Sequence, residues 1–236
     1  MTDGLVGRTP GGPIPDGVSH EVRRALTGQW PRWRGRLHRV AIPLSAAAGV
    51  LLVLSAPVGR DRVGAAIFTV GAVTLFSVSG LVHLRRWRVP LWEVLYRCDH
   101  AAIFLLIATC ATPLALSALD GGAGRLMLWA VWIGAALGIA MRLLPFHPPK
   151  GLMNTLFIVL GWVPVVVAPS LISALEPPAL ALVGLEGLLY VAGALMLGAR
   201  WPRLWPAVFG YHEVWHTLVV LAVAAHFVVV FLIVHP

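Results

Sequence analysis

The sequence predicts an all-α integral membrane protein, a bundle of seven transmembrane helices whose N-terminus is cytoplasmic and whose C-terminus is extracytoplasmic. Hydrophobic residues make up 58% of the 236 residues and charged residues 12%, and the mean hydropathy is +0.84. One soluble core of this size does not need so apolar a composition. Seven apolar runs and an alternating distribution of basic residues between their loops complete the prediction.

The first 38 residues are polar and rich in Gly, Pro and Arg, and they contain no apolar segment typical of a cleavable signal peptide. We therefore predict a disordered cytoplasmic tail over 1–38, with a short helix over 18–26. The seven-helix domain is expected over 39–236.

Each of seven apolar runs has about the 20 residues that cross a hydrocarbon core. In chain order they are 40–57, 63–84, 99–119, 126–144, 152–172, 179–198 and 212–234. Short loops containing Pro, Gly or charged residues separate them, at 58–62, 85–98, 120–125, 145–151, 173–178 and 199–211. These runs account for the chain after residue 39, so no separate soluble domain is expected.

The basic residues define an orientation. With seven spans, fifteen Lys and Arg residues fall in the N-terminal tail and in the loops on its side of the membrane, and three fall on the other side, namely Arg60, Arg62 and Arg125. Positive charge accumulates on the cytoplasmic side, so we predict a multi-pass protein of the inner (plasma) membrane. The net charge of +8 is then a topology signal, and no nucleic-acid partner is expected.

His212 and His216 open the last apolar run and are four residues apart. On a helix this spacing places two imidazoles on one face, one turn apart, where both can bind one metal ion. Zinc is the expected metal. Cys98 and Cys110 fall within one predicted helical region and support neither a disulfide framework nor a thiolate site.

The predicted orientation brings three more polar residues to the same leaflet. His83 lies near the cytoplasmic end of the second run, with Ser79 one turn deeper, and Asp99 is expected at the start of the third. Three imidazoles leave one tetrahedral zinc position open, and a water there has its pKa lowered towards about 7. We assign His83, His212 and His216 as metal ligands, Asp99 as a base for that water and Ser79 as a hydroxyl that positions it.

Simpler roles exist for each of these residues. Asp99 could cap the start of its helix, Ser79 could bond its own helix backbone, and a single histidine could bind a lipid headgroup. Glu186 falls inside the sixth run and needs a partner or a proton. No metal is expected at the remaining histidines, which are His20, His38, His100, His147, His226 and His235.

The segment from His212 to His216 also fits the His-Glu-x-x-His pattern of zinc proteases, in which the glutamate is the general base. Leu119-Asp120-Gly121 resembles the motif that supplies the third ligand in intramembrane site-2 proteases. Here, however, the aspartate motif precedes the histidine motif. Asp120 is also expected at the far side of the membrane, so the protease reading ranks low.

Three polar motifs occur in the order Ser79-x-x-x-His83, Asp99 in a run ending near Thr112-Pro113, and His212-x-x-x-His216. Together these motifs resemble the hemolysin III family, the bacterial branch of the progestin and adipoQ receptor superfamily. The segment 32–38 and the pattern Gly187-x-x-Tyr190-x-x-Gly193 are also similar to family elements. The resemblance implies a seven-helix bundle with zinc on His83, His212 and His216, and with Ser79 and Asp99 near the metal-bound water. Glu186 departs from the family, which usually has a small residue there.

The expected function is a zinc-dependent, ceramidase-like hydrolase acting on an amide- or ester-linked lipid from the bilayer, by analogy with related seven-helix proteins. Two alternatives stay open: a receptor-like or stress-responsive regulator with structural zinc, and the membrane lysis that gave the family its name. Membrane lipids are the expected partners. The sequence specifies neither the substrate nor the oligomeric state.

Overall fold

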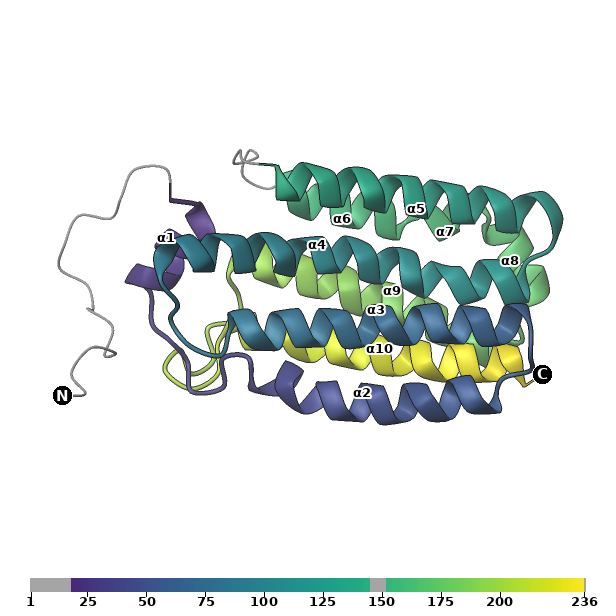
Figure 1. The fold of residues 1–236 in the computed structure, drawn as a ribbon, viewed down its shortest axis with the longest axis horizontal. Coiled ribbons are helices and arrows are strands. Elements are labelled where there is room, and N and C mark those ends of the chain that lie inside the picture. Colours follow the sequence, from purple (N-terminus) through teal and green to yellow (C-terminus); the bar gives the residue numbers. More distant parts are fainter. Residues whose placement is uncertain (1–17, 145–151, 236) are drawn as a thin grey trace.

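A computed structural model describes residues 18–144 and 152–235 and shows a bundle of long helices lying side by side (Figure 1). The long helices are α2 (Arg36–Ser55), α3 (Arg60–Val82), α4 (Val89–Pro113), α5 (Gly121–Leu143), α9 (Pro177–Ala199) and α10 (Tyr211–Val234). The shorter ones are α1 (His20–Thr27), α6 (Leu152–Gly161), α7 (Val163–Val166), α8 (Ala168–Ala174) and the π-helix η1 (Leu114–Ala118) that continues α4. No strand occurs in the described parts of the chain, so the predicted all-α class is confirmed.

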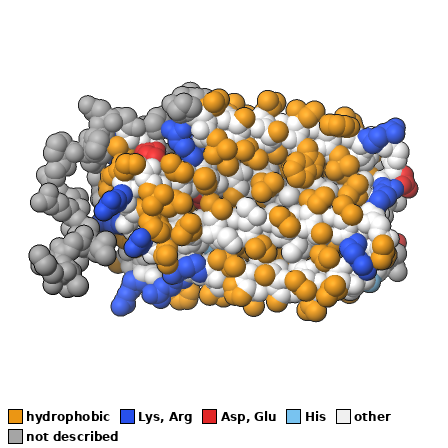
Figure 2. Space-filling view, viewed as in Figure 1, with side chains coloured by type: hydrophobic (Ala, Val, Ile, Leu, Met, Phe, Trp, Pro, Cys, Tyr) orange, Lys and Arg blue, Asp and Glu red, His pale blue; other side chains and the backbone are white. Residues whose placement is uncertain are grey.

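Six of these helices are long and apolar enough to cross a membrane, and there are seven such spans if a bent pair of helices is counted as one. Large apolar side chains face outward from them: Leu44 is 65% exposed and Leu137 is 64% exposed. Figure 2 shows hydrophobic side chains over the middle of one face, with Lys and Arg gathered near its two ends. This pattern is what a lipid-facing surface requires, because a bilayer solvates apolar side chains and its headgroup regions solvate charges.

The fifth span is broken, whereas the sequence predicted one helix over 152–172. Its two parts are bent by 59° relative to each other. Pro164 and Pro169 stand in the first turns of α7 and α8. Proline has no N–H group for the preceding helical turn and starts a new helix well, so each proline ends one segment and begins the next.

The third span starts ten residues earlier than predicted. Helix α4 begins at Val89, with Arg88 as its N-cap and Pro90 in its first turn. The polar residues up to Cys98, which were assigned to a loop, form the first turns of this helix. Asp99 therefore lies in the third turn, so the simpler alternative, in which Asp99 caps the start of its helix, is wrong.

Helix α1 packs at one end of the bundle, against α4. Val22 is fully buried with Val82, Trp92 and Tyr96 in a small apolar cluster. The Ser19 N–H group donates to Glu93 Oε1 at 2.6 Å. The short helix predicted over 18–26 thus exists, while residues 1–17 of the predicted tail and the loop 145–151, with His147, lie outside the described residues.

Candidate metal centre

Three histidines meet at the end of the bundle where α10 begins. His83 comes from the end of α3, and His212 and His216 come from the first two turns of α10. One ring nitrogen from each lies within 4.8 Å of those of the other two. Ring centroids are 4.7 Å apart for His83 and His212, 5.0 Å for His83 and His216, and 4.6 Å for His212 and His216. The predicted meeting of the second and seventh spans is therefore observed.

Local structure explains how the three rings converge. Gly210 is the N-cap of α10, and the Glu213 side chain accepts a hydrogen bond from the Gly210 N–H group at 2.9 Å, which defines the start of the helix. His83 is the C-cap of α3, and its N–H group donates to the Ser79 carbonyl at 3.2 Å. Both helix ends thus place their histidines at the same depth.

The donor set fits a tetrahedral divalent cation. Zinc binds imidazole nitrogen at about 2.0–2.1 Å, so tetrahedral angles place two such nitrogens about 3.3–3.4 Å apart. The Nε2 atoms of His83 and His212 lie 3.2 Å apart. His83 and His216 are 0% and 3% exposed, so their rings are removed from water. Neutral rings with converging nitrogens are the form that binds a metal.

Asp99 and Ser79 lie beside this cluster. Asp99 Oδ2 is 3.8 Å from His83 Nε2, too far for a strong hydrogen bond, and the Asp99 side chain is 15% exposed. Ser79 is buried one turn before His83 on α3, and its side chain interacts with the Asp99 carboxyl group. The structure therefore brings all five predicted residues together, with Asp99 next to the three histidines and not among the converging ring nitrogens.

Two neighbours of the cluster were not predicted. The His38 ring stacks on the His216 ring at 3.9 Å between centroids and 6° between planes, and His38 is buried. The Arg34 Nε atom lies 2.9 Å from Glu213 Oε1. Both residues were assigned to the polar tail because apolar periodicity begins only near residue 40. Their one sequence signal was the family-like segment 32–38.

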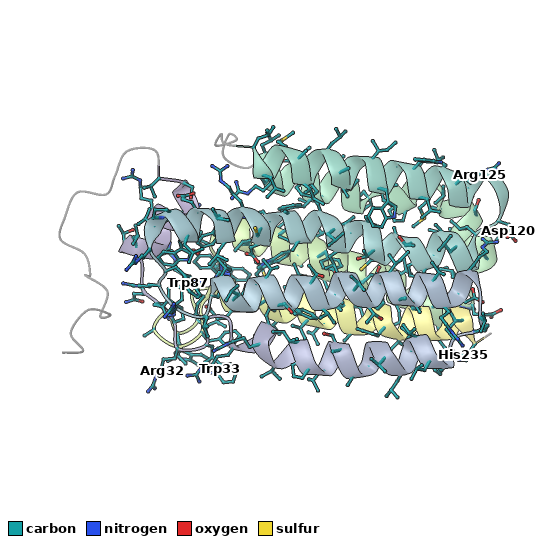
Figure 3. The ribbon with its side chains drawn as sticks, viewed as in Figure 1. Arg32, Trp33, Trp87, Asp120, Arg125 and His235 are labelled. Carbon is teal, nitrogen blue, oxygen red and sulfur yellow. The ribbon has the colours of Figure 1, made fainter. Side chains whose placement is uncertain are left out.

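The surroundings of Glu213 and of Asp120 both argue against a zinc protease. Glu213 is 1% exposed, and its two carboxylate oxygens contact Arg34 and the Gly210 N–H group, so it has a structural role. Asp120 lies at the opposite end of the bundle, with Arg125 and His235 (Figure 3). Its side chain is 99% exposed and faces Arg60 at 3.9 Å. Asp120 therefore cannot provide a third ligand.

The other described histidine side chains have contacts of their own. His100 Nδ1 lies 2.8 Å from the Tyr96 carbonyl and 3.3 Å from Arg142. His235 contacts the Phe231 carbonyl, and His226 contacts Glu186. The structure describes the His20 backbone within α1.

A cavity of about 1540 Å³ adjoins two of the three histidines, His212 and His216. Asp99, His212 and His216 line one part of it, and Phe157 and Val183 line its apolar part. Three further lining residues are strongly exposed: Trp162 at 54%, Val165 at 55% and Leu188 at 70%. They lie on α7, its N-cap and α9, so the broken fifth span and α9 contribute exposed apolar side chains to the cavity wall.

A family model described as "Haemolysin-III related" matches residues 29–227. This range includes the three histidines of the cluster together with Ser79 and Asp99. The chain belongs to the haemolysin-III related family. Its membership and its apolar helices together make it a multi-pass membrane protein.

Two bacterial members of the haemolysin-III related family cover nearly the whole chain. A hemolysin-3 homolog of Bacillus subtilis is 30% identical over 213 residues, covering 89% of this chain and 92% of its own length. Hemolysin-3 of Bacillus cereus is 28% identical and covers 93% and 94%. The human monocyte to macrophage differentiation factor is 25% identical over 171 residues, covering 71% and 68%.

Proposed function

We propose that this haemolysin-III related protein binds zinc through His83, His212 and His216 and hydrolyses an amide- or ester-linked lipid that enters from the bilayer. The observation that carries the proposal is the convergence of three imidazoles beside a carboxylate, at the wall of a large cavity. Bound zinc would supply Lewis-acid activation of a carbonyl group and of water.

The protein's own residues then have distinct tasks. Asp99, 3.8 Å from the nearest imidazole nitrogen, would accept a proton from the attacking water and return it to the leaving group. Ser79 would hold the Asp99 carboxylate in place through its hydroxyl group. The apolar cavity wall would orient the lipid chain and exclude bulk water from the reacting carbonyl.

The metal assignment is tested by elemental analysis of the purified full-length protein, with anomalous scattering at the zinc edge in crystals. We expect about one zinc per chain in the wild type and much less in His83→Ala, His212→Ala and His216→Ala, because a three-ligand site rarely keeps its affinity with two. His235→Ala is the matched control, since His235 lies at the opposite end of the bundle. Stoichiometric zinc in His212→Ala would remove the ligand assignment.

The hydrolase assignment is tested separately with Asp99→Asn. We expect this variant to retain zinc and to lose hydrolysis of an N-acyl or acyl-ester lipid by 10²-fold or more, the usual contribution of a general base. A readout of lipid cleavage by mass spectrometry on zinc-loaded protein is required. Unchanged turnover in Asp99→Asn would exclude this carboxylate as the base.

A second function is favoured by one feature of the centre. Its ligands come from α3 and α10, so a metal there would also cross-link the two helices. In a receptor or regulator with structural zinc, chelation would lower thermal stability while purified wild type would cleave none of the lipids above. That pair of results would select the structural role over the hydrolase.

A further inference from the structure

A second polar group lies deep in the bundle, away from the three histidines. Glu186 on α9 and His226 on α10 face each other, with Glu186 Oε2 2.7 Å from His226 Nδ1. Their side chains are 13% and 1% exposed. His226 is ten residues beyond His216 on the same helix, about 15 Å along its axis at 1.5 Å per residue. The pair is therefore separate from the candidate metal centre and lies within the span.

Burying this pair is expensive, and the surrounding packing does not require it. Ionisable groups inside a span are costly and usually face a partner or a cavity. The His226 ring packs edge-on against Phe68, at 4.7 Å between centroids, and its Nε2 atom is buried with no hydrogen-bond partner among the described residues. Two apolar side chains of similar volume would fill this space at lower cost. The pair therefore points to a role beyond helix packing.

The carboxylate of the pair belongs to the wall of the large cavity. Glu186 lines the cavity, and Tyr190, one turn further along α9, lines it on the same helical face. The Tyr190 hydroxyl group is buried and has no hydrogen-bond partner within the described part of the chain. Cys110 lines the cavity from the facing helix α4. A carboxylate and an unsatisfied phenol thus meet in a cavity whose wall is otherwise largely apolar.

The chemistry of these groups matches a hydroxyl group. Glu186 Oε2 lies 2.7 Å from His226 Nδ1, so the imidazole already contacts one oxygen of the carboxyl group. The buried Tyr190 hydroxyl group has no hydrogen-bond partner among the described residues. A ligand hydroxyl group can donate to the Glu186 carboxylate and accept from the Tyr190 phenol at the same time.

We propose that Glu186, His226 and Tyr190 form a second binding site, which recognises a hydroxyl group carried part-way along the chain of a lipid held in the cavity. The depth of the pair selects a hydroxyl group remote from a lipid head that lies at the three histidines. This inference depends on the proposed function only in taking the cavity to hold a lipid with its head at the candidate metal centre; it does not require zinc or hydrolysis.

The test is calorimetric binding of two matched probes to full-length protein in detergent: 12-hydroxyoctadecanoate and octadecanoate. We expect the hydroxylated chain to bind the wild type about tenfold more tightly, since it gains hydrogen bonds to a carboxylate and a phenol. Tyr190→Phe, which removes one hydroxyl group only, should reduce this preference. The double variant Glu186→Met/His226→Leu should abolish it, and removing both partners of the pair should leave the fold intact.

A third probe, 2-hydroxyoctadecanoate, tests the depth of the site. It should bind like octadecanoate, because its hydroxyl group stays near the head. Equal affinity of the wild type for all three probes would overturn the proposal, as would a preference that persists in the double variant. Zinc content is measured on the same samples. Protein that binds no zinc but still prefers the hydroxylated chain would contradict the proposed function and support this inference.

Discussion

At the residue scale, Glu213 and Gly35 show how single side chains position the candidate centre. Glu213 connects the start of α10 to Arg34, so it holds the helix that bears two of the three histidines. Gly35 has φ +68°, the left-handed region, and lies directly against His83. A Cβ atom at Gly35 would come 2.6 Å from the Cβ atom of His83.

Glu213→Gln should lower the stability of the folded protein. Removing the charge leaves Arg34, which is 14% exposed, without its partner, so we expect a loss of about 1–3 kcal/mol in the free energy of unfolding. Thermal unfolding in detergent measures the change. If hydrolysis is detected, Glu213→Gln should retain more of it than Asp99→Asn once corrected for folded protein. The reverse order would restore the glutamate as general base.

Gly35→Ala should disturb the metal centre, and Gly121→Ala provides a matched control. Both glycines have left-handed φ angles, +68° and +62°, so each alanine costs about 1–2 kcal/mol of backbone strain. Only Gly35 contacts His83, whereas nothing lies within 4 Å of a Cβ atom at Gly121. We therefore expect bound zinc to fall in Gly35→Ala and to stay unchanged in Gly121→Ala. Equal zinc content in the two variants would show that the contact with His83 is unimportant.

At the element scale, close helix packing holds the bundle together where lipid offers no hydrophobic driving force. Helices α3 and α4 approach closely at Gly71, where a Cβ atom would clash with the Thr109 side chain. Small residues allow such contacts in membranes, where association depends on van der Waals packing. The two helices also bear His83 and Asp99, so their separation sets the geometry of the site.

Gly71→Ala should therefore be destabilising. Overpacking costs about 1–3 kcal/mol in a well-packed core. Gly184→Ala on α9 is the control, because a Cβ atom there meets nothing within 4 Å. Unfolding in detergent should show a lower midpoint for Gly71→Ala alone. A midpoint for Gly71→Ala equal to that of Gly184→Ala would mean that the α3–α4 contact yields without cost.

At the scale of the whole molecule, the two ends of the bundle differ in charge and in the residues that they bear. Arg32, Trp33 and Trp87 lie at the end that bears α1, and Asp120, Arg125 and His235 lie at the other (Figure 3). From the distribution of basic residues we propose that the first end is cytoplasmic and that the chain resides in the plasma membrane. The candidate centre would then face the cytoplasmic leaflet.

Cysteine labelling in intact cells tests this orientation. In a variant with Cys98 and Cys110 replaced by serine, Asp120→Cys should react with a membrane-impermeant maleimide, because Asp120 is 99% exposed at the end that we propose to be outside. Arg32→Cys should react only after the cells are permeabilised. Labelling of Arg32→Cys in intact cells would reverse the assignment.

The sequence alone determined the family, the helical class and the residues of the candidate centre. These properties depend on local composition and spacing: runs of about 20 apolar residues, and pairs such as Ser79 with His83 and His212 with His216 at helical spacing. The start of α4 was missed because hydropathy marks where a helix enters lipid, while α4 continues into a polar region stabilised by Trp92 and Tyr96 packing on α1.

Only the tertiary structure decided which distant residues meet. The stacking of His38 on His216, the ion pair of Arg34 with Glu213 and the pairing of Glu186 with His226 join elements far apart in the chain, and no spacing encodes them. The physical reason is that apolar surfaces in lipid pack by shape, so contacts between helices follow the whole bundle, whereas each helix follows its own sequence.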